Sequence, residues 1–217
     1  PKAKKTKQAN VSTDASNSES NGDDDNDEDE DSDDDDDDDE DESNREAGIV
    51  LRIHVENFMN HRKLTVKLNK HLNFITGRNG SGKSAIATGL MVALGSKTGA
   101  TGRGTSLAGL IREGSNSPAI IQVTLQNTGA DAYEPDRCGK KIIVERTIRK
   151  SASGCTSSYR VLNGDTLTEI TRDKKQLDRV LAQYNIHIQN PCCVLTQEES
   201  KKFIQGSVTD KYEFFMN

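Results

Sequence analysis

One short stretch of the sequence decides the fold: Gly77-Arg78-Asn79-Gly80-Ser81-Gly82-Lys83-Ser84. It fits the pattern G-x-x-x-x-G-K-[ST], which is typical of a loop that binds phosphate groups. Its glycines let the backbone curl so that successive N–H groups point at phosphate oxygens, and a following helix adds the partial positive charge of its N-terminus. The pattern therefore predicts that Lys83 reaches the terminal phosphates of a nucleotide and that the Ser84 hydroxyl binds Mg²⁺. The alternative is a glycine-rich turn with a surface lysine.

The residues around this stretch predict the strand and the helix that such a loop requires. Residues 71–76 read as a short strand, and residues 85–94 are apolar at helical spacing until Gly95, a usual helix terminator. Asn163-Gly164 predicts a hairpin between residues 159 and 170. Similar patterns predict strands at residues 49–55, 64–68, 119–125 and 141–148, a helix at 173–184, and loops at 95–104 and 129–139. We expect an α/β fold with a mixed sheet around the helix after the loop.

Charge divides the chain into two unlike parts. The 217 residues carry 29 Lys+Arg and 35 Asp+Glu, a net charge of −6. Residues 1–42 hold twenty carboxylates and four lysines, or −16, whereas the remaining 175 residues hold 25 basic and 15 acidic side chains, or +10. The acidic part has too few apolar residues to offset the entropy of ordering. We therefore predict a disordered acidic tail at residues 1–48 and a folded region at residues 49–217.

Composition excludes several classes of protein. No apolar run reaches the roughly 20 residues that span a bilayer, and no signal-peptide stretch is present, so we expect a soluble intracellular protein without membrane contact. The histidines show no metal-binding spacing, and the cysteines lack the C-x-x-C spacing of zinc or redox sites. The cysteines are interpreted as buried or idle thiols: Cys138, Cys155, Cys192 and Cys193. The +10 of the folded region fits a surface that binds nucleic acid, or one that is only solvated.

Three segments together resemble the amino-terminal half of the ATPase head in the structural maintenance of chromosomes (SMC) family: residues 57–61 (Asn-Phe-Met-Asn-His), 73–77 and 79–85. Further segments are similar to the sixth-subunit type, which pairs with the fifth-subunit type: residues 129–135, 190–191, 194–197, 202–204 and 211–216. Ala85 stands where most branches of the family have asparagine, and it agrees with the sixth-subunit type. The resemblance covers residues 49–217 and leaves out the acidic tail.

The resemblance implies roles for individual residues. It assigns residues 77–84 to ATP and Mg²⁺, and Gln197 to the loop glutamine that senses the metal and the γ-phosphate, an amide oxygen being a suitable ligand. Residues 188–197 are expected to run from a strand into that loop. Arg103 matches an arginine that links DNA contact to hydrolysis in the family. Asn60 and His61 are weaker candidates for contact with the nucleotide.

The same resemblance implies what this part of a head lacks. After Ser84 the sequence has no apolar strand ending in Asp-Glu and no Ser-Gly-Gly-type signature segment. In the family both lie in a carboxy-terminal half that returns after a long coiled coil, so no catalytic residue is expected in this chain. The implied partners are that carboxy-terminal half, a fifth-subunit-type SMC protein, kleisin and other non-SMC subunits, and double- and single-stranded DNA. The implied setting is the nucleus and its chromosomes, with a role in homologous-recombination repair of double-strand breaks and in chromosome organisation.

Other interpretations remain open from the sequence alone. A DNA-end-processing head that works with a nuclease shares the phosphate-binding loop and differs in residues 129–135 and 211–216. A self-contained kinase or GTPase would need an Asp-bearing strand, which the sequence does not offer convincingly. A DNA-binding scaffold could hold nucleotide only for stability. The acidic tail is interpreted as a solvating arm, or as a competitor of DNA or a binder of a basic protein such as a histone.

Overall fold

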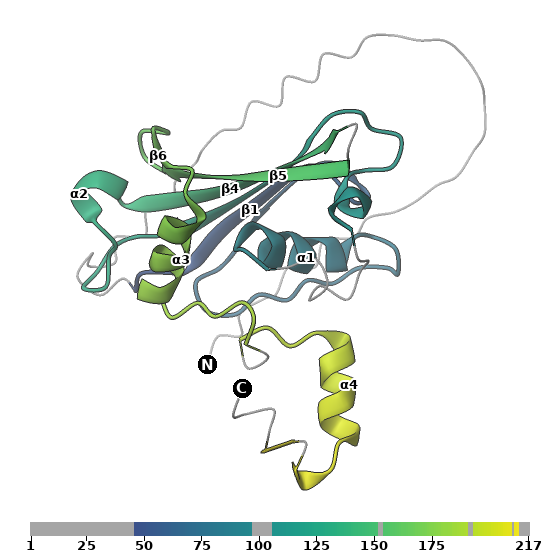
Figure 1. Cartoon of the computed structure of the whole chain (residues 1–217). Coiled ribbons are helices and arrows are strands. Elements are labelled where there is room, and N and C mark those ends of the chain that lie inside the picture. The colour runs from purple at the N-terminus through teal and green to yellow at the C-terminus, as the bar shows by residue number, and fades with distance from the viewer. Residues whose placement is uncertain (1–45, 97–105, 152–153, 191–192, 210, 213–217) are drawn as a thin grey trace, which may run out of the picture. The chain divides into compact units, whose positions relative to one another are not determined.

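The computed structural model describes residues 46–96, 106–151, 154–190, 193–209 and 211–212 (Figure 1). Nearly all of the predicted acidic tail, Arg103 and Cys192 lie outside these residues, as does most of the segment 211–216. No helix in the described parts of the chain has the length and apolar character needed to cross a membrane. Of the described cysteines, Cys138 is buried, Cys193 is exposed, and both are free thiols like Cys155.

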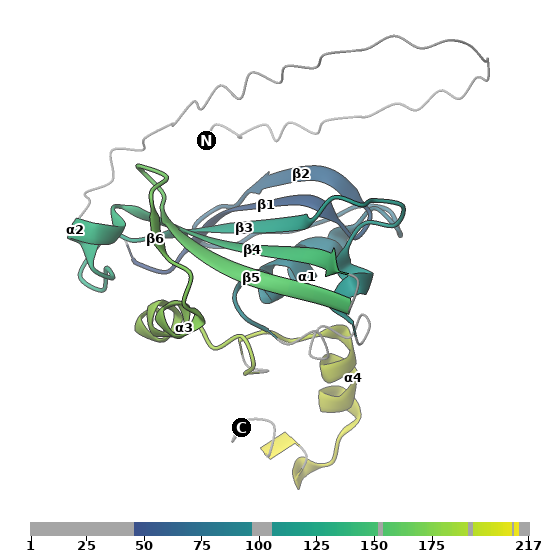
Figure 2. The ribbon, with the colours of Figure 1, turned by 45° about the horizontal axis from the view of Figure 1, so that its top comes forward.

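A six-stranded sheet in the order β2-β1-β3-β4-β5-β6 forms the body of the fold (Figure 2). Every pair of neighbouring strands is antiparallel. The strands are β1 (Val50–Phe58), β2 (His61–Lys67), β3 (Ala119–Gln126), β4 (Lys141–Ser151), β5 (Gly154–Asn163) and β6 (Glu169–Thr171). The helical elements are α1 (Lys83–Ala93), a 3-10 helix η3 (Leu107–Leu110), α2 (Pro135–Cys138), α3 (Lys174–Gln183) and α4 (Gln197–Gln205). The α/β class is confirmed.

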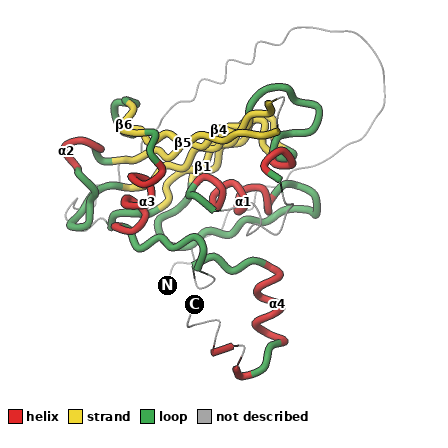
Figure 3. Tube along the Cα trace, in the orientation of Figure 1, coloured by secondary structure: helices red, strands yellow, loops and turns green. Residues whose placement is uncertain are grey.

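One face of the sheet is apolar because the strands alternate apolar and polar side chains. In β3 the side chains of Ala119, Ile121, Val123 and Leu125 are fully buried, and the intervening residues point to the other face. Figure 3 shows α1 and α3 on the same side of the sheet. Helix α1 packs closely on β1, since a Cβ added at Gly89 would lie 3.4 Å from Ile53 and Val55 side chains. The face away from α1, here called the open face, carries no helix among the described residues.

The strand predicted at residues 71–76 is absent, and with it the mixed character of the sheet. This segment pairs with no strand in the described chain, and its apolar side chains are exposed: 68% for Leu72, 82% for Phe74 and 42% for Ile75. A strand exists only where a neighbour accepts and donates its main-chain hydrogen bonds. The apolar pattern of residues 71–76 was a local signal, and no described segment provides that neighbour.

The hairpin predicted at Asn163-Gly164 is confirmed, although its turn is longer than the dipeptide. The N–H of Asn163 donates to the carbonyl of Thr168 at 2.9 Å, which closes the loop between β5 and β6. The positive φ falls on Leu167, at 57°. Gly164 is required by close packing instead, because an added Cβ would lie 2.6 Å from Cβ of Lys141.

Residues 129–139, predicted as a loop, contain the short helix α2 and are organised by Asn127. The Asn127 side chain, 1% exposed, donates to the carbonyls of Tyr133 at 3.0 Å and Gly139 at 2.7 Å. Its Oδ1 accepts from the N–H of Tyr133 at 2.6 Å and from the Tyr184 hydroxyl at 2.5 Å. Burial is the main reason that the pKa of Tyr184 is raised above its ordinary value. A buried amide with all its partners fixes both ends of this segment.

A buried arginine ties the end of α1 to the sheet. Arg146 of β4 is 7% exposed and donates through Nη1 to the carbonyls of Val92 at 2.8 Å and Ser96 at 3.3 Å. Its guanidinium lies 4.7 Å from the ring centroid of Tyr159. Burial lowers the pKa of Arg146. The cation stands at the negative end of the α1 dipole and adds a donor to two carbonyls at and just after the end of the helix.

Replacing Arg146 with methionine is expected to lower the free energy of unfolding by about 1–3 kcal/mol, because the carbonyls of Val92 and Ser96 lose their charged donor. Denaturant unfolding of the chain measures the change. Arg149→Met is the matched control, since Arg149 is an exposed residue of the same strand, and it should change stability by no more than about 0.5 kcal/mol. Equal losses in the two variants would contradict the structural role of Arg146.

Candidate phosphate-binding site

Residues 77–84 form a tight loop that runs into α1. Gly80 and Gly82 have φ of 85° and 88°, a region that side chains other than glycine adopt at a cost. The N–H of Ser81 donates to the carbonyl of Arg78 at 3.2 Å, and the N–H of Ala85 donates to that of Gly82 at 2.8 Å. The chain therefore turns on itself before α1 begins at Lys83, as the motif predicts.

Lys83 folds back over the start of the loop. Its Nζ donates to the carbonyl of Gly77 at 2.6 Å and to that of Arg78 at 2.7 Å. The loop thus holds a positive charge at its mouth. A phosphate oxygen would offer this ammonium a charge-assisted hydrogen bond in place of two carbonyl bonds.

The N-terminus of α1 is open to an anion. Its N-cap, Gly82, provides no side-chain hydrogen bond, and the first turn contains no acidic residue. The first amides of a helix have no partner within the helix and carry partial positive charge. Ser84, the second residue of α1, is exposed and lies at this same end. The arrangement can bind phosphate through main-chain amides and Lys83, with a hydroxyl beside them for a metal ion.

His61 lies directly against this loop. It is the first residue of β2 and pairs with Phe58 across the β1–β2 hairpin. A Cβ added at Gly82 would overlap His61 Nε2 and lie 2.5 Å from Cε1. The Nε2 atom is buried and makes no hydrogen bond among the described residues. Asn60, its neighbour in the turn, is exposed and shows no such contact.

Gln197 is placed differently from the prediction. It is the first residue of α4 and is exposed, whereas a loop glutamine after a strand was expected. The described residues from 188 to 196 form turns and irregular segments without a strand. No hydrogen bond described for the chain joins Gln197 to the phosphate-binding loop. The structure therefore brings together residues 77–84 and His61, describes no hydrogen bond between Gln197 and these residues, and does not describe Arg103.

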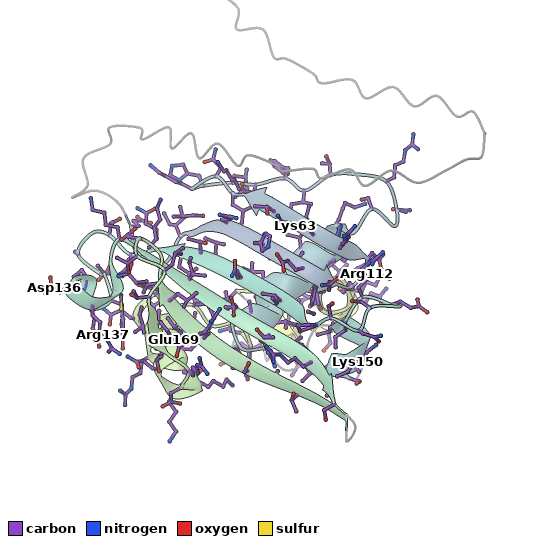
Figure 4. The ribbon with its side chains drawn as sticks, turned by 90° about the horizontal axis from the view of Figure 1, so that it is seen from above. Lys63, Arg112, Asp136, Arg137, Lys150 and Glu169 are labelled. Atoms are coloured by element: carbon purple, nitrogen blue, oxygen red, sulfur yellow. The ribbon has the colours of Figure 1, made fainter. Side chains whose placement is uncertain are left out.

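Basic side chains lie at one end of the sheet, a grouping that sequence reasoning did not locate. Figure 4 shows Lys63, Arg112 and Lys150 toward one end of the sheet, and Asp136, Arg137 and Glu169 at the other. The antiparallel order explains the first group: Lys63 lies near the start of β2, Arg112 follows η3, and Lys150 lies near the end of β4. These three residues are called the basic end below. Only the strand order could have revealed it.

The carboxylates on the open face are held by neighbours. Glu145 Oε1 lies 2.9 Å from Nη2 of Arg160, and Glu145 Oε2 accepts from Gln122 at 2.8 Å. Glu56 Oε1 lies 3.1 Å from Nε2 of His54. Glu145 and Glu56 therefore both have hydrogen-bonding partners on this face of the sheet. His61 and the phosphate-binding loop lie at this same end of the sheet, because β2 begins there.

Comparisons with known proteins agree with this geometry. A family model described as AAA domain matches residues 52–216. Structural maintenance of chromosomes protein 6 of Dictyostelium discoideum is 41% identical over 174 residues, which cover 79% of this chain and 14% of that protein. The human protein of the same name is 43% identical over 173 residues, covering 79% of this chain and 15% of that protein. The chain thus spans about one seventh of the length of these relatives.

A solved structure shows the same fold. It comes from work titled "Structural biochemistry of ATP-driven dimerization and DNA stimulated activation of SMC ATPases" and aligns with a TM-score of 0.60 at 20% identity. The alignment covers 77% of this chain and 98% of that one. Sequence identity above 40% to the sixth-subunit proteins, with a head fold built around the phosphate-binding loop, leads to one assignment. The chain belongs to the structural maintenance of chromosomes family, as the amino-terminal half of an ATPase head of the sixth-subunit type.

Proposed function

We propose that this chain is the ATP-binding half of an SMC head whose ATP-driven engagement with a fifth-subunit-type partner organises and repairs chromosomes. Residues 49–217 form the head lobe and residues 1–48 an acidic tail. The observation that carries the proposal is the loop at residues 77–84, with Lys83 held at its mouth and the N-terminus of α1 uncapped beyond it. The setting proposed from the family is the nucleus, in homologous-recombination repair and chromosome organisation.

The loop residues have separate tasks in binding ATP. The amides at the start of α1 face the phosphates, and Lys83 exchanges its two carbonyl bonds for the β- and γ-phosphates. The Ser84 hydroxyl and the Gln197 amide oxygen are hard oxygen donors of the kind that Mg²⁺ prefers, and both are exposed. Bound Mg²⁺ neutralises phosphate charge. We propose that the Gln197 side chain joins Ser84 at the metal when nucleotide binds.

The carboxy-terminal half of the same head is the first proposed partner. The segment 71–76 pairs with no strand in the described chain, and Leu72 and Phe74 are mainly exposed. Such a segment offers main-chain donors and acceptors together with apolar side chains to an added strand. We propose that the missing half covers it and contributes the carboxylate that activates water. Kleisin and other non-SMC subunits are further partners proposed from the family.

DNA, double- and single-stranded, is the proposed ligand of the basic end. Lys63, Arg112 and Lys150 come from three separate elements and lie toward the same end of the sheet (Figure 4). Lysine and arginine bind phosphate backbones without reading sequence, through release of counterions. The phosphate-binding loop lies at the same end of the sheet, so the proposed DNA contact and nucleotide site are close enough for one to influence the other. Arg103 is proposed as part of that coupling.

Replacing Lys83 with alanine tests the proposed function. We expect ATP affinity to fall by about a hundredfold or more, because the variant loses the ammonium that meets the β- and γ-phosphates. Isothermal titration calorimetry with Mg-ATP, on the full-length protein assembled with its SMC partner, measures the change. Lys175→Ala removes an exposed lysine of α3 and should leave affinity unchanged. Equal affinity of the Lys83→Ala and unmodified proteins would overturn the proposed function.

A further inference from the structure

Two glycines of the phosphate-binding loop have the same backbone conformation and different surroundings. Gly80 and Gly82 have φ of 85° and 88°. A Cβ added at Gly80 would meet nothing within 4 Å, whereas one added at Gly82 would overlap the His61 imidazole. Gly80 is therefore required for its φ alone. Gly82 is required both for its φ and because His61 fills the space where a side chain would stand.

His61 is held firmly in that position. The turn before it is anchored to the segment around η3, because the N–H of Met59 donates to the carbonyl of Leu110 at 2.8 Å. Next to this bond, the N–H of Arg112 donates to the carbonyl of Asn57, also at 2.8 Å. Phe58, which pairs with His61, is fully buried and also bridges to Ile111. The β1–β2 hairpin thus presents the ring to the loop from a rigid support.

We propose that His61 is a positioning residue for the phosphate-binding loop. The His61 ring packs against Gly82 where a Cβ would otherwise stand. This contact fixes the position of the peptide that leads into α1. The amides at the start of α1 depend on that peptide for their direction, and small errors in the placement of donors reduce binding strongly. The proposal rests on the proposed function, since it concerns the affinity of the same loop for nucleotide.

The first test measures Mg-ATP affinity of His61 variants by calorimetry, on the full-length protein assembled with its SMC partner. His61→Ala removes the support and should weaken binding by about tenfold. His61→Gln, whose amide nitrogen reaches the place of Nε2, should recover most of that loss. Denaturant unfolding of each variant separates loss of affinity from loss of folding. If His61→Ala binds as well as the unmodified protein, or if His61→Gln is as weak as His61→Ala, the positioning role is overturned.

The second test is a double-mutant cycle that detects the contact itself. Gly82→Ala should nearly abolish binding, because its Cβ displaces His61 and its φ is strained. Adding His61→Ala to Gly82→Ala frees the space and should raise affinity at least about threefold above Gly82→Ala alone. Gly80→Ala is the matched control, because its Cβ meets nothing and His61→Ala should not rescue it. The absence of rescue at Gly82, or equal rescue at Gly80, would exclude the contact. Lys83→Ala is measured beside these variants. If it loses binding while the His61 variants do not, the proposed function stands and only the positioning role is overturned.

Discussion

Supplying the carboxy-terminal half of the head is expected to convert this chain from an ATP-binding fragment without turnover into an ATPase. On the proposed function, the carboxylate that activates water comes from the carboxy-terminal half, since the sequence after Ser84 contains no Asp-Glu strand and no signature segment. Lys83 and Ser84 can hold phosphate but cannot remove a proton from the attacking water. We expect the release of inorganic phosphate to rise by at least about a hundredfold on co-expression of the two halves.

Two controls test whether the phosphate release comes from the reassembled head. The Lys83→Ala variant, co-expressed with the same half and its SMC partner, should return phosphate release to background, which excludes a contaminating ATPase. Release with and without DNA separates an active head from a scaffold that holds nucleotide for stability alone. Phosphate release by the purified chain at the rate of the reassembled head would contradict the assignment of catalysis to the missing half.

Removing residues 1–42 is expected to raise the affinity of the chain for DNA by roughly tenfold or more at low salt. The deletion takes away 20 carboxylates and four lysines, which changes the net charge from −6 to +10. A polyanion such as DNA then meets a positive chain instead of a negative one. Because salt screens these charges, the gain should shrink as salt is added. Fluorescence anisotropy of labelled DNA measures the affinity of both forms.

The basic end predicts where the gained affinity resides. Reversing Lys63 and Lys150 to glutamate in the shortened chain should remove most of the gain. Reversing Lys174 and Lys175 makes the same change of charge on α3, which follows β6 at the other end of the sheet, and should remove much less (Figures 1 and 4). Equal DNA affinity before and after the deletion at low salt would exclude an electrostatic role of the tail. Equal effects of the two reversals would exclude a localised site.

The sequence predicted best those elements whose signals are local. The helix after the loop, the buried alternation of β3 and the turn after Asn163 each depend on residues close together in the chain. The first half of β5, Gly154–Ser158, was missed because its small polar side chains carry no apolar alternation. Residues 71–76 were predicted as a strand because their apolar residues favour an extended conformation. A strand also needs a neighbouring strand to pair with, which the local sequence does not show. Arg146 was missed because its role depends on contact between β4 and the end of α1.

The site was predictable to the same extent as its local motif. The loop at residues 77–84 could be predicted from the sequence, because the spacing of its glycines and Lys83 defines the motif. His61 comes sixteen residues before the motif begins, and it reaches Gly82 only because the β1–β2 hairpin turns it toward α1. The family assigned Gln197 to the nucleotide, but the described residues do not bring it to the loop. Contact between Gln197 and the nucleotide depends on how α4 is positioned relative to the loop, which the sequence motif does not determine.

The exposed apolar segment at residues 71–76 has a consequence for biosynthesis. Relatives of this type continue for several times the length of this chain, which is about one seventh of the human protein. At about 5–20 residues per second, a ribosome needs on the order of one minute to make the rest. On the proposal that the carboxy-terminal half covers them, Leu72 and Phe74 remain exposed during that interval and can contact other unpaired strands or apolar surfaces. The emerging amino-terminal half is therefore a natural client for chaperones, and its yield in a recombinant host should improve when the other half is made in the same cell.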